Sequence, residues 1–148
     1  MTENRTEFLY TIFIVATPDV VWRGLTDPEF TARYWSHENV SDWRPGSKWE
    51  HQRLDKSGAD IVGKVIESDP PRRLVITWVR PKDAASPDAA SRVTFEIVDH
   101  GRGVTKLMLW HEELEPGSDM DRGIREGWPM VLSNLKTLLE TGKSATLW

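Results

Sequence analysis

The chain has 148 residues, no cysteine and a formal net charge of −4 at pH 7. This length suits one domain with a sizeable core, and the lack of cysteine excludes disulfides, thiolate metal sites and cysteine nucleophiles. The net negative charge argues against a nucleic-acid-binding surface, because such a surface needs clustered Lys and Arg. No apolar run approaches the roughly 20 residues of a membrane span. Because the N-terminus also lacks the apolar stretch of a signal peptide, we expect a cytoplasmic protein that does not bind membranes.

A strand and two short helices are predicted first along the chain. Residues 8–16 are rich in β-branched and aromatic side chains, which is typical of a strand. Thr17 is a good N-cap and is followed by Pro18 and Asp19, which predicts the start of a helix. The same signal at residues 27–29 predicts a second short helix over about residues 27–33.

Five more strands follow, over residues 48–54, 60–68, 74–79, 92–98 and 105–111. Alternation places one face of each strand inward, and the main inward residues are Trp49, His51, Leu74, Ile76, Trp78, Val93, Phe95, Ile97, Leu107, Leu109 and His111. Short connections predict an antiparallel meander. Residues 81–90, with Pro, Ala, Asp and Ser, predict a flexible hairpin loop.

The last predicted element is a long helix. Its apolar residues recur at three- and four-residue steps, which indicates a stripe facing a core: Trp128, Val131, Leu132, Leu135, Leu138 and Leu139. Gly142 is a suitable stop. Pro129 should bend the helix if it begins near Ser118. The element order predicts one α+β domain over residues 1–148, with its core at about 6–142. The long helix crosses the concave face of a curved sheet and leaves a cavity.

The chain resembles the domains named after the activator homologue of the heat-shock-protein-90 ATPase, in the START-like SRPBCC superfamily. The resemblance covers about residues 6–142. The matching segments are residues 16–22, 25–29, 34–35, 41–43 with Gly46, 63–65, 69–74, 91–95, and Gly127-Trp128 before Leu132 and Leu135. It implies a helix-grip fold. Because this superfamily holds hydrophobic-ligand carriers, cyclase-like enzymes and cochaperone domains, it implies function only loosely.

No metal or nucleophile motif is found. The four histidines, His37, His51, His100 and His111, lack zinc-motif spacing, and there is no G-x-S-x-G elbow. We therefore expect no metal and no cofactor. His51 and His111 face inward and can meet there, where a histidine can act as acid or base. They are the catalytic candidates, with Glu67 or Glu112 as added acids, although core histidines more often only form hydrogen bonds.

The eight tryptophans are the main positive signal. Rigid indole rings around a cavity suit an apolar or aromatic ligand. The alternative to a ligand pocket is that the rings simply fill the space. Trp22 is assigned to the core. The predicted ligand-binding residues are Trp35, Trp49, His51, Ile76, Trp78, Phe95, Leu109, His111, Trp128 and Leu132. The entrance is expected near the short helices, the 81–90 loop and the start of the long helix, where Gly123, Gly127 and Pro129 permit movement.

Three functions follow in order of preference. The first is binding of a small hydrophobic, aromatic or lipid-like molecule, without catalysis. The second is an enzyme of the cyclase or hydrolase type that uses His51 or His111, and the third is a cochaperone-like domain that stimulates a heat-shock ATPase. Met108 and Trp110 lie opposite the inward face of their strand, so this face is also a candidate homodimer surface.

Overall fold

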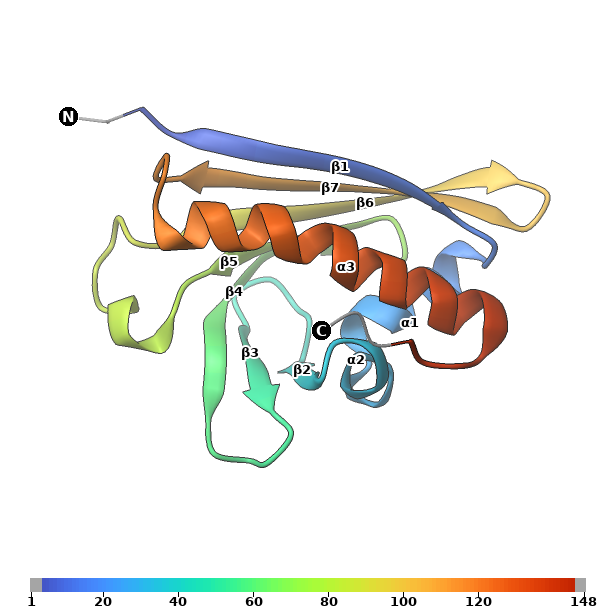
Figure 1. Cartoon of the computed structure of the whole chain (residues 1–148), viewed down its shortest axis with the longest axis horizontal. Helices are drawn as coiled ribbons and strands as arrows, with labels where there is room; N and C mark the ends of the chain where they lie inside the picture. The colour runs from blue at the N-terminus through green and yellow to red at the C-terminus, as the bar shows by residue number, and fades with distance from the viewer. Residues whose placement is uncertain (1–3, 146–148) are drawn as a thin grey trace.

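A curved antiparallel sheet and a long C-terminal helix dominate the computed structural model, which describes residues 4–145 (Figure 1). The sheet has seven strands in the order β1-β7-β6-β5-β4-β3-β2. In chain order the elements are β1 (Thr6–Ile14), α1 (Pro18–Thr26), α2 (Pro28–Tyr34), β2 (His37–Ser41), β3 (Lys48–Arg53), β4 (Ala59–Asp69), β5 (Arg73–Trp78), the 3₁₀ helix η1 (Pro81–Asp83), β6 (Ser91–Gly101), β7 (Val104–Leu114) and α3 (Asp119–Thr141). The expected α+β helix-grip fold is confirmed.

The helix ends lie where the capping residues predict them. Thr17 caps α1, and the carboxylate of Asp27 accepts a hydrogen bond from the backbone N–H of Glu29 at the start of α2 (3.0 Å). Ser118 caps α3 through the backbone N–H of Asp121 (3.1 Å). Gly142 ends α3 with φ 76°, a left-handed conformation that glycine adopts without steric cost.

Two features of the fold differ from or add to the expectation. Strand β2 was not predicted, because its sequence is mostly polar and has no apolar alternation. It forms the sheet edge beside β3, and its inward residue Asn39 is buried through hydrogen bonds rather than apolar contact. Pro129 lies inside α3, which continues through it from Asp119 to Thr141. The bend expected at Pro129 stays a prediction.

Helix α3 covers the concave face of the sheet and reaches the edge strand β1 (Figure 1). Its apolar stripe packs into the core, where Leu132 and Leu135 are fully buried. On its side facing β1, Lys136 Nζ donates to the carbonyl of Phe13 (2.7 Å), and the Glu140 carboxylate accepts from the N–H of Val15 (2.7 Å). These bonds satisfy backbone groups that an edge strand otherwise leaves open to pairing with another chain.

The concave side of the sheet, which α3 covers, is therefore the interior of the molecule (Figure 1). No helix within residues 4–145 is long and apolar enough to cross a membrane.

Candidate functional site

All ten predicted ligand-binding residues lie in the interior between the sheet and α3. Their exposed fractions range from 0% for His111 and Leu132 to 9% for Trp35. The indole rings contact one another: the ring centroids of Trp35 and Trp128 are 5.3 Å apart, and those of Trp78 and Trp128 are also 5.3 Å apart. Trp49 joins this cluster through Trp78 at 5.7 Å. The rings thus fill most of the space in which the sequence predicts a cavity.

A small crevice remains at the surface of this cluster. It has a volume of about 120 Å³ and is lined by Trp35, Trp78, Gly123, Ile124, Gly127, Trp128 and Val131. A Cβ atom added at Gly123 or Gly127 would meet no atom within 4 Å, so the two glycines leave this part of the α3 surface open. Ile124 and Val131 were not predicted to line the site, although their helical spacing from Trp128 indicates the same side of α3.

His111 is held in one tautomer by two hydrogen bonds. Trp128 Nε1 is a donor only, and it donates to His111 Nδ1 over 3.0 Å. The proton of the neutral imidazole therefore lies on Nε2, which is 2.7 Å from Ser91 Oγ. The Ser91 hydroxyl then donates to the carbonyl of Trp78 (3.2 Å). Burial lowers the pKa of His111 to about 3, which matches this neutral, fully bonded state.

This tautomer also decides what the Ser91–His111 pair can do chemically. A serine nucleophile needs a histidine nitrogen that accepts its proton. Here Nε2 already carries the proton and faces Ser91 as a donor, because Trp128 occupies Nδ1. The pair is arranged as a structural hydrogen-bond chain and not as an activated serine.

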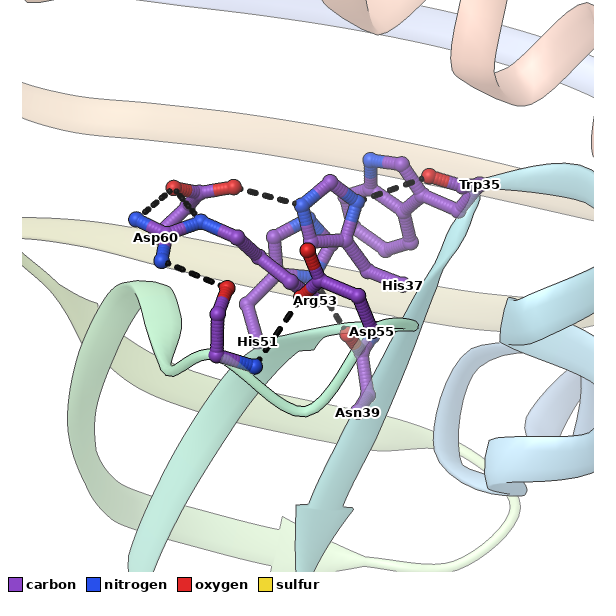
Figure 2. A network of polar contacts seen from close by, with 8 residues as sticks. Trp35, His37, Asn39, His51, Arg53, Asp55 and Asp60 are labelled. Atoms are coloured by element: carbon purple, nitrogen blue, oxygen red, sulfur yellow. Dashed lines mark hydrogen bonds and ion pairs between the residues drawn. The ribbon is translucent and has the colours of Figure 1, made fainter.

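His51 belongs to a separate polar network (Figure 2), and its ring contacts the aromatic cluster at Trp35, with centroids 4.7 Å apart. Its Nδ1 donates to the side-chain oxygen of Asn39 (2.6 Å), because the Asn39 amide nitrogen donates to the carbonyl of Leu25. The ring of His37 stacks on His51 with centroids 3.9 Å apart and an angle of 9°. Burial, and then the nearby charge of His37, lower the pKa of His51 to about 3.

His37 connects this stack to the rim of the sheet. Its Nδ1 faces the carbonyl of Trp35 (3.0 Å) and its Nε2 faces the carboxylate of Asp60 (2.7 Å), as Figure 2 shows. Both partners are acceptors, so only the imidazolium form of His37 donates to both. The hydrogen bond from His37 lowers the pKa of Asp60, and Arg53 Nε donates to the same carboxylate (2.9 Å).

The two candidate catalytic histidines do not meet, contrary to the expectation that they can. The ring of Trp78 contacts both, with centroids 6.2 Å from His51 and 5.4 Å from His111. Each histidine forms hydrogen bonds to its own polar partners instead. Within residues 4–145, no group of three or more His, Cys, Asp or Glu side chains is placed to hold a metal ion.

A larger hollow of about 480 Å³ lies beside the start of α3 and the 81–90 loop. It is lined by charged groups of both signs, among them Arg80, Asp83, Glu113 and Arg122. The sulfur of Met120, which also lines it, accepts a hydrogen bond from Trp78 Nε1 (3.3 Å). For an apolar ligand, the smaller crevice beside the tryptophans has the more suitable walls.

The fold and this aromatic interior define a helix-grip domain of the SRPBCC type. The family model described as Activator of Hsp90 ATPase homolog 1-like protein matches residues 15–140, and the chain belongs to this family. No curated protein matches the chain in sequence.

Several solved structures have the same fold. CalU16 from Micromonospora echinospora is 27% identical with a TM-score of 0.71, over 92% of this chain and 77% of that chain. An Hsp90 activator from Plasmodium falciparum is 24% identical with a TM-score of 0.75, over 90% and 95% of the two chains. The Aha1 dimer from Colwellia psychrerythraea is 18% identical with a TM-score of 0.77, over 94% and 99%. The last two likenesses establish the fold alone.

Proposed function

We propose that this protein binds a small apolar or aromatic molecule in the crevice beside Trp35, Trp78 and Trp128. One observation supports this above all: three indole rings border an open hollow on a helix surface where two glycines leave room. Indole walls favour apolar and aromatic surfaces, and aromatic pairs gain energy beyond the area they bury.

The size of the crevice restricts the ligand. An apolar cavity of about 150 Å³ is known to hold a benzene-sized molecule, and the crevice has about 120 Å³. Removing roughly 300 Å² of apolar surface from water contributes about 7.5 kcal/mol, and association costs about 4 kcal/mol or more. We therefore propose roughly millimolar binding of single-ring ligands. Larger ligands require Trp35 to move, and it is the most exposed of these rings.

The test compares two leucine substitutions on α3 while toluene and indole are titrated against the protein. Gly127→Leu places a side chain in the crevice, whereas Glu126→Leu places the same side chain at an adjacent, exposed position. NMR shifts of the indole N–H groups report binding. We expect the Glu126→Leu protein to bind as the unmodified chain does and Gly127→Leu to lose binding at least tenfold. Equal binding by the two variants contradicts the proposal.

The histidine contacts favour binding over acid–base catalysis. His111 has no exposed surface and uses both ring nitrogens in hydrogen bonds. His51 is 4% exposed, and its pKa is lowered far below neutrality. A general base works best when its pKa is near the operating pH. We propose structural roles for both histidines. Turnover of any substrate that is lost in His111→Gln, with binding retained, would contradict this.

Family membership supports a second candidate function, stimulation of an Hsp90-type ATPase. The Plasmodium falciparum neighbour is described as an Hsp90 activator. The measurement is the ATPase rate of purified Hsp90 with increasing amounts of this chain. A saturable increase supports the activator role, and an unchanged rate at high excess argues against it. The cytoplasmic location stays a prediction that cell fractionation tests.

We also propose a homodimer through the convex face of β1 and β7. Leu9 and Phe13 are 54% and 44% exposed there, and Leu9 lies opposite the half-buried Trp110 in the strand register. The Colwellia psychrerythraea structure is described as a dimer. Light scattering should give a dimer mass that becomes monomeric in Leu9→Glu. The matched control is Val40→Glu, at an exposed position on the opposite edge strand. A monomeric unmodified chain contradicts the proposal.

A further inference from the structure

A second hollow lies on the convex side of β3 and β4, away from the tryptophan crevice. It has a volume of about 390 Å³, and the chain beyond β5 borders it through Val79, Ala84 and Ala90. Most of its lining is apolar or small. Its charged lining residues are Lys48, Glu50 and Lys64. The hollow therefore combines an apolar floor with two ammonium groups and one carboxylate.

The two lysines lie directly opposite each other on neighbouring antiparallel strands. Side chains in such a pair have Cβ atoms roughly 5 Å apart, and like charges there destabilise the sheet. Neither ammonium group has an ion pair or a hydrogen bond with any residue in the described part of the chain. The carboxylate of Glu50 lines the same hollow and accepts a hydrogen bond from Gln52 Nε2 (2.9 Å).

Nine of the nineteen lysines and arginines form ion pairs within the part of the chain that the structure describes. Ion pairs to carboxylates are formed by Arg23, Arg53, Lys56, Arg72, Arg73, Arg92, Arg122, Arg125 and Lys136. Lys48 and Lys64 form no ion pair within residues 4–145, and they place two positive charges opposite each other beside the single carboxylate of Glu50. A bound anion would relieve their mutual repulsion and gain attraction from both.

The floor of the hollow is rigid. Trp49 Nε1 donates to the carbonyl of Thr77 (2.7 Å), and the backbone N–H of Lys64 donates to Thr77 Oγ1 (2.8 Å). The indole passes so close to Gly63 that a Cβ there would lie 2.5 Å from Trp49 Nε1 and 2.0 Å from the Thr77 oxygen. The site is therefore formed before any ligand arrives, which lowers the cost of binding.

We propose that this hollow binds a small organic anion, namely a carboxylate or sulfonate attached to an apolar body. The ammonium groups of Lys48 and Lys64 hold the anionic group. The apolar body lies against Val62, Val79 and Ala84. This site is independent of the proposed tryptophan crevice, since the two hollows share no lining residue.

The test titrates octanoate and octanol, which share an apolar chain and differ in charge, and follows backbone amide shifts by NMR. We expect octanoate to shift the amides of Gly63, Ala84 and Ala90, and octanol to bind at least tenfold more weakly. The double variant Lys48→Gln, Lys64→Gln should reduce octanoate affinity at least tenfold. The control Lys143→Gln, at an exposed position after α3, should leave it unchanged.

Three results would overturn the proposal: equal binding of octanoate and octanol, full affinity in the double variant, or shifts confined to Gly123 and Gly127. The last result would place the ligand in the tryptophan crevice. The Gly127→Leu variant separates the two proposals, because it blocks the crevice and should leave octanoate binding at Gly63 intact. The comparison of octanoate with octanol uses the unmodified protein and does not depend on how the variants fold.

Discussion

Trp128 Nε1 donates a hydrogen bond to His111 Nδ1 over 3.0 Å, and this bond joins the middle of α3 to the last strand of the sheet. The bond is completely buried, since the two residues are 2% and 0% exposed. It gives the indole N–H a partner in the core and assigns the histidine proton to Nε2. The chain through Ser91 to the carbonyl of Trp78 then leaves no polar atom of this group unpaired.

Replacing Trp128 by phenylalanine removes the donor and leaves His111 Nδ1 buried without a partner. We expect the free energy of unfolding to fall by about 2–4 kcal/mol, from the lost bond and the reduced ring volume. Urea denaturation measures this. Trp22→Phe is the matched control, since Trp22 is only partly buried and its indole N–H forms no hydrogen bond with the described residues. Equal losses in the two variants would show that ring volume alone matters.

Acid should destabilise the fold well above the range in which carboxylates titrate. Burial lowers the pKa of both His51 and His111 to about 3, compared with 6.5 for an ordinary histidine. The unfolded chain therefore binds more protons, and the stability is complete above pH 6.5 and is lost as the pH falls toward 3. Two such groups correspond to about 3 kcal/mol between pH 6.5 and pH 5.

Urea unfolding at pH 7, 6 and 5 tests this dependence. His111→Gln should reduce the pH dependence by about half, since one of the two depressed groups is removed. The exposed His100 offers the control, and His100→Gln should leave the slope unchanged. A free energy of unfolding that is constant from pH 7 to pH 5 would contradict the neutral state of both histidines.

Asn39→Ala should destabilise the fold through His51. The Asn39 side chain is 3% exposed and accepts the Nδ1–H of His51 over 2.6 Å. Its loss leaves that donor buried and unpaired, which costs about 1–3 kcal/mol. Val40→Ala changes the neighbouring exposed residue of the same strand and should cost less than about 0.5 kcal/mol. Similar losses for both, measured by thermal unfolding, would rule out the hydrogen bond as the cause.

Two glycine-to-alanine substitutions should have opposite effects. At Gly63 a Cβ would lie 2.0 Å from the Thr77 carbonyl oxygen, and the backbone there has no room to yield without breaking the Trp49 bond. We expect a loss of more than about 3 kcal/mol. At Gly127 a Cβ meets open space inside a helix, so alanine should stabilise by about 0.5–1 kcal/mol. A tolerated Gly63→Ala would mean that the close approach is not maintained in solution.

Much of the candidate site was predictable because strands and helices have fixed periods. The period of two placed Trp49, His51 and Trp78 inward, and the helical period placed Trp128 against the sheet. Strand β2 was missed because its one buried residue, Asn39, is polar. Asn39 is buried by bonds to His51 and Leu25, and such partners are not visible in a local pattern.

Apart from β2 and η1, the order of the elements, their caps and the inward faces of strands β3 to β7 were determined by the sequence alone, because they depend on contacts between residues near in the chain. The space left between sheet and helix was decided only by tertiary packing, since the shape of a cavity depends on how rings from separate elements fit together. Tertiary structure also decided the tautomer of His111 and the placement of Lys48 opposite Lys64. Each depends on partners from different strands or helices. A local sequence pattern does not specify how those elements are aligned with one another.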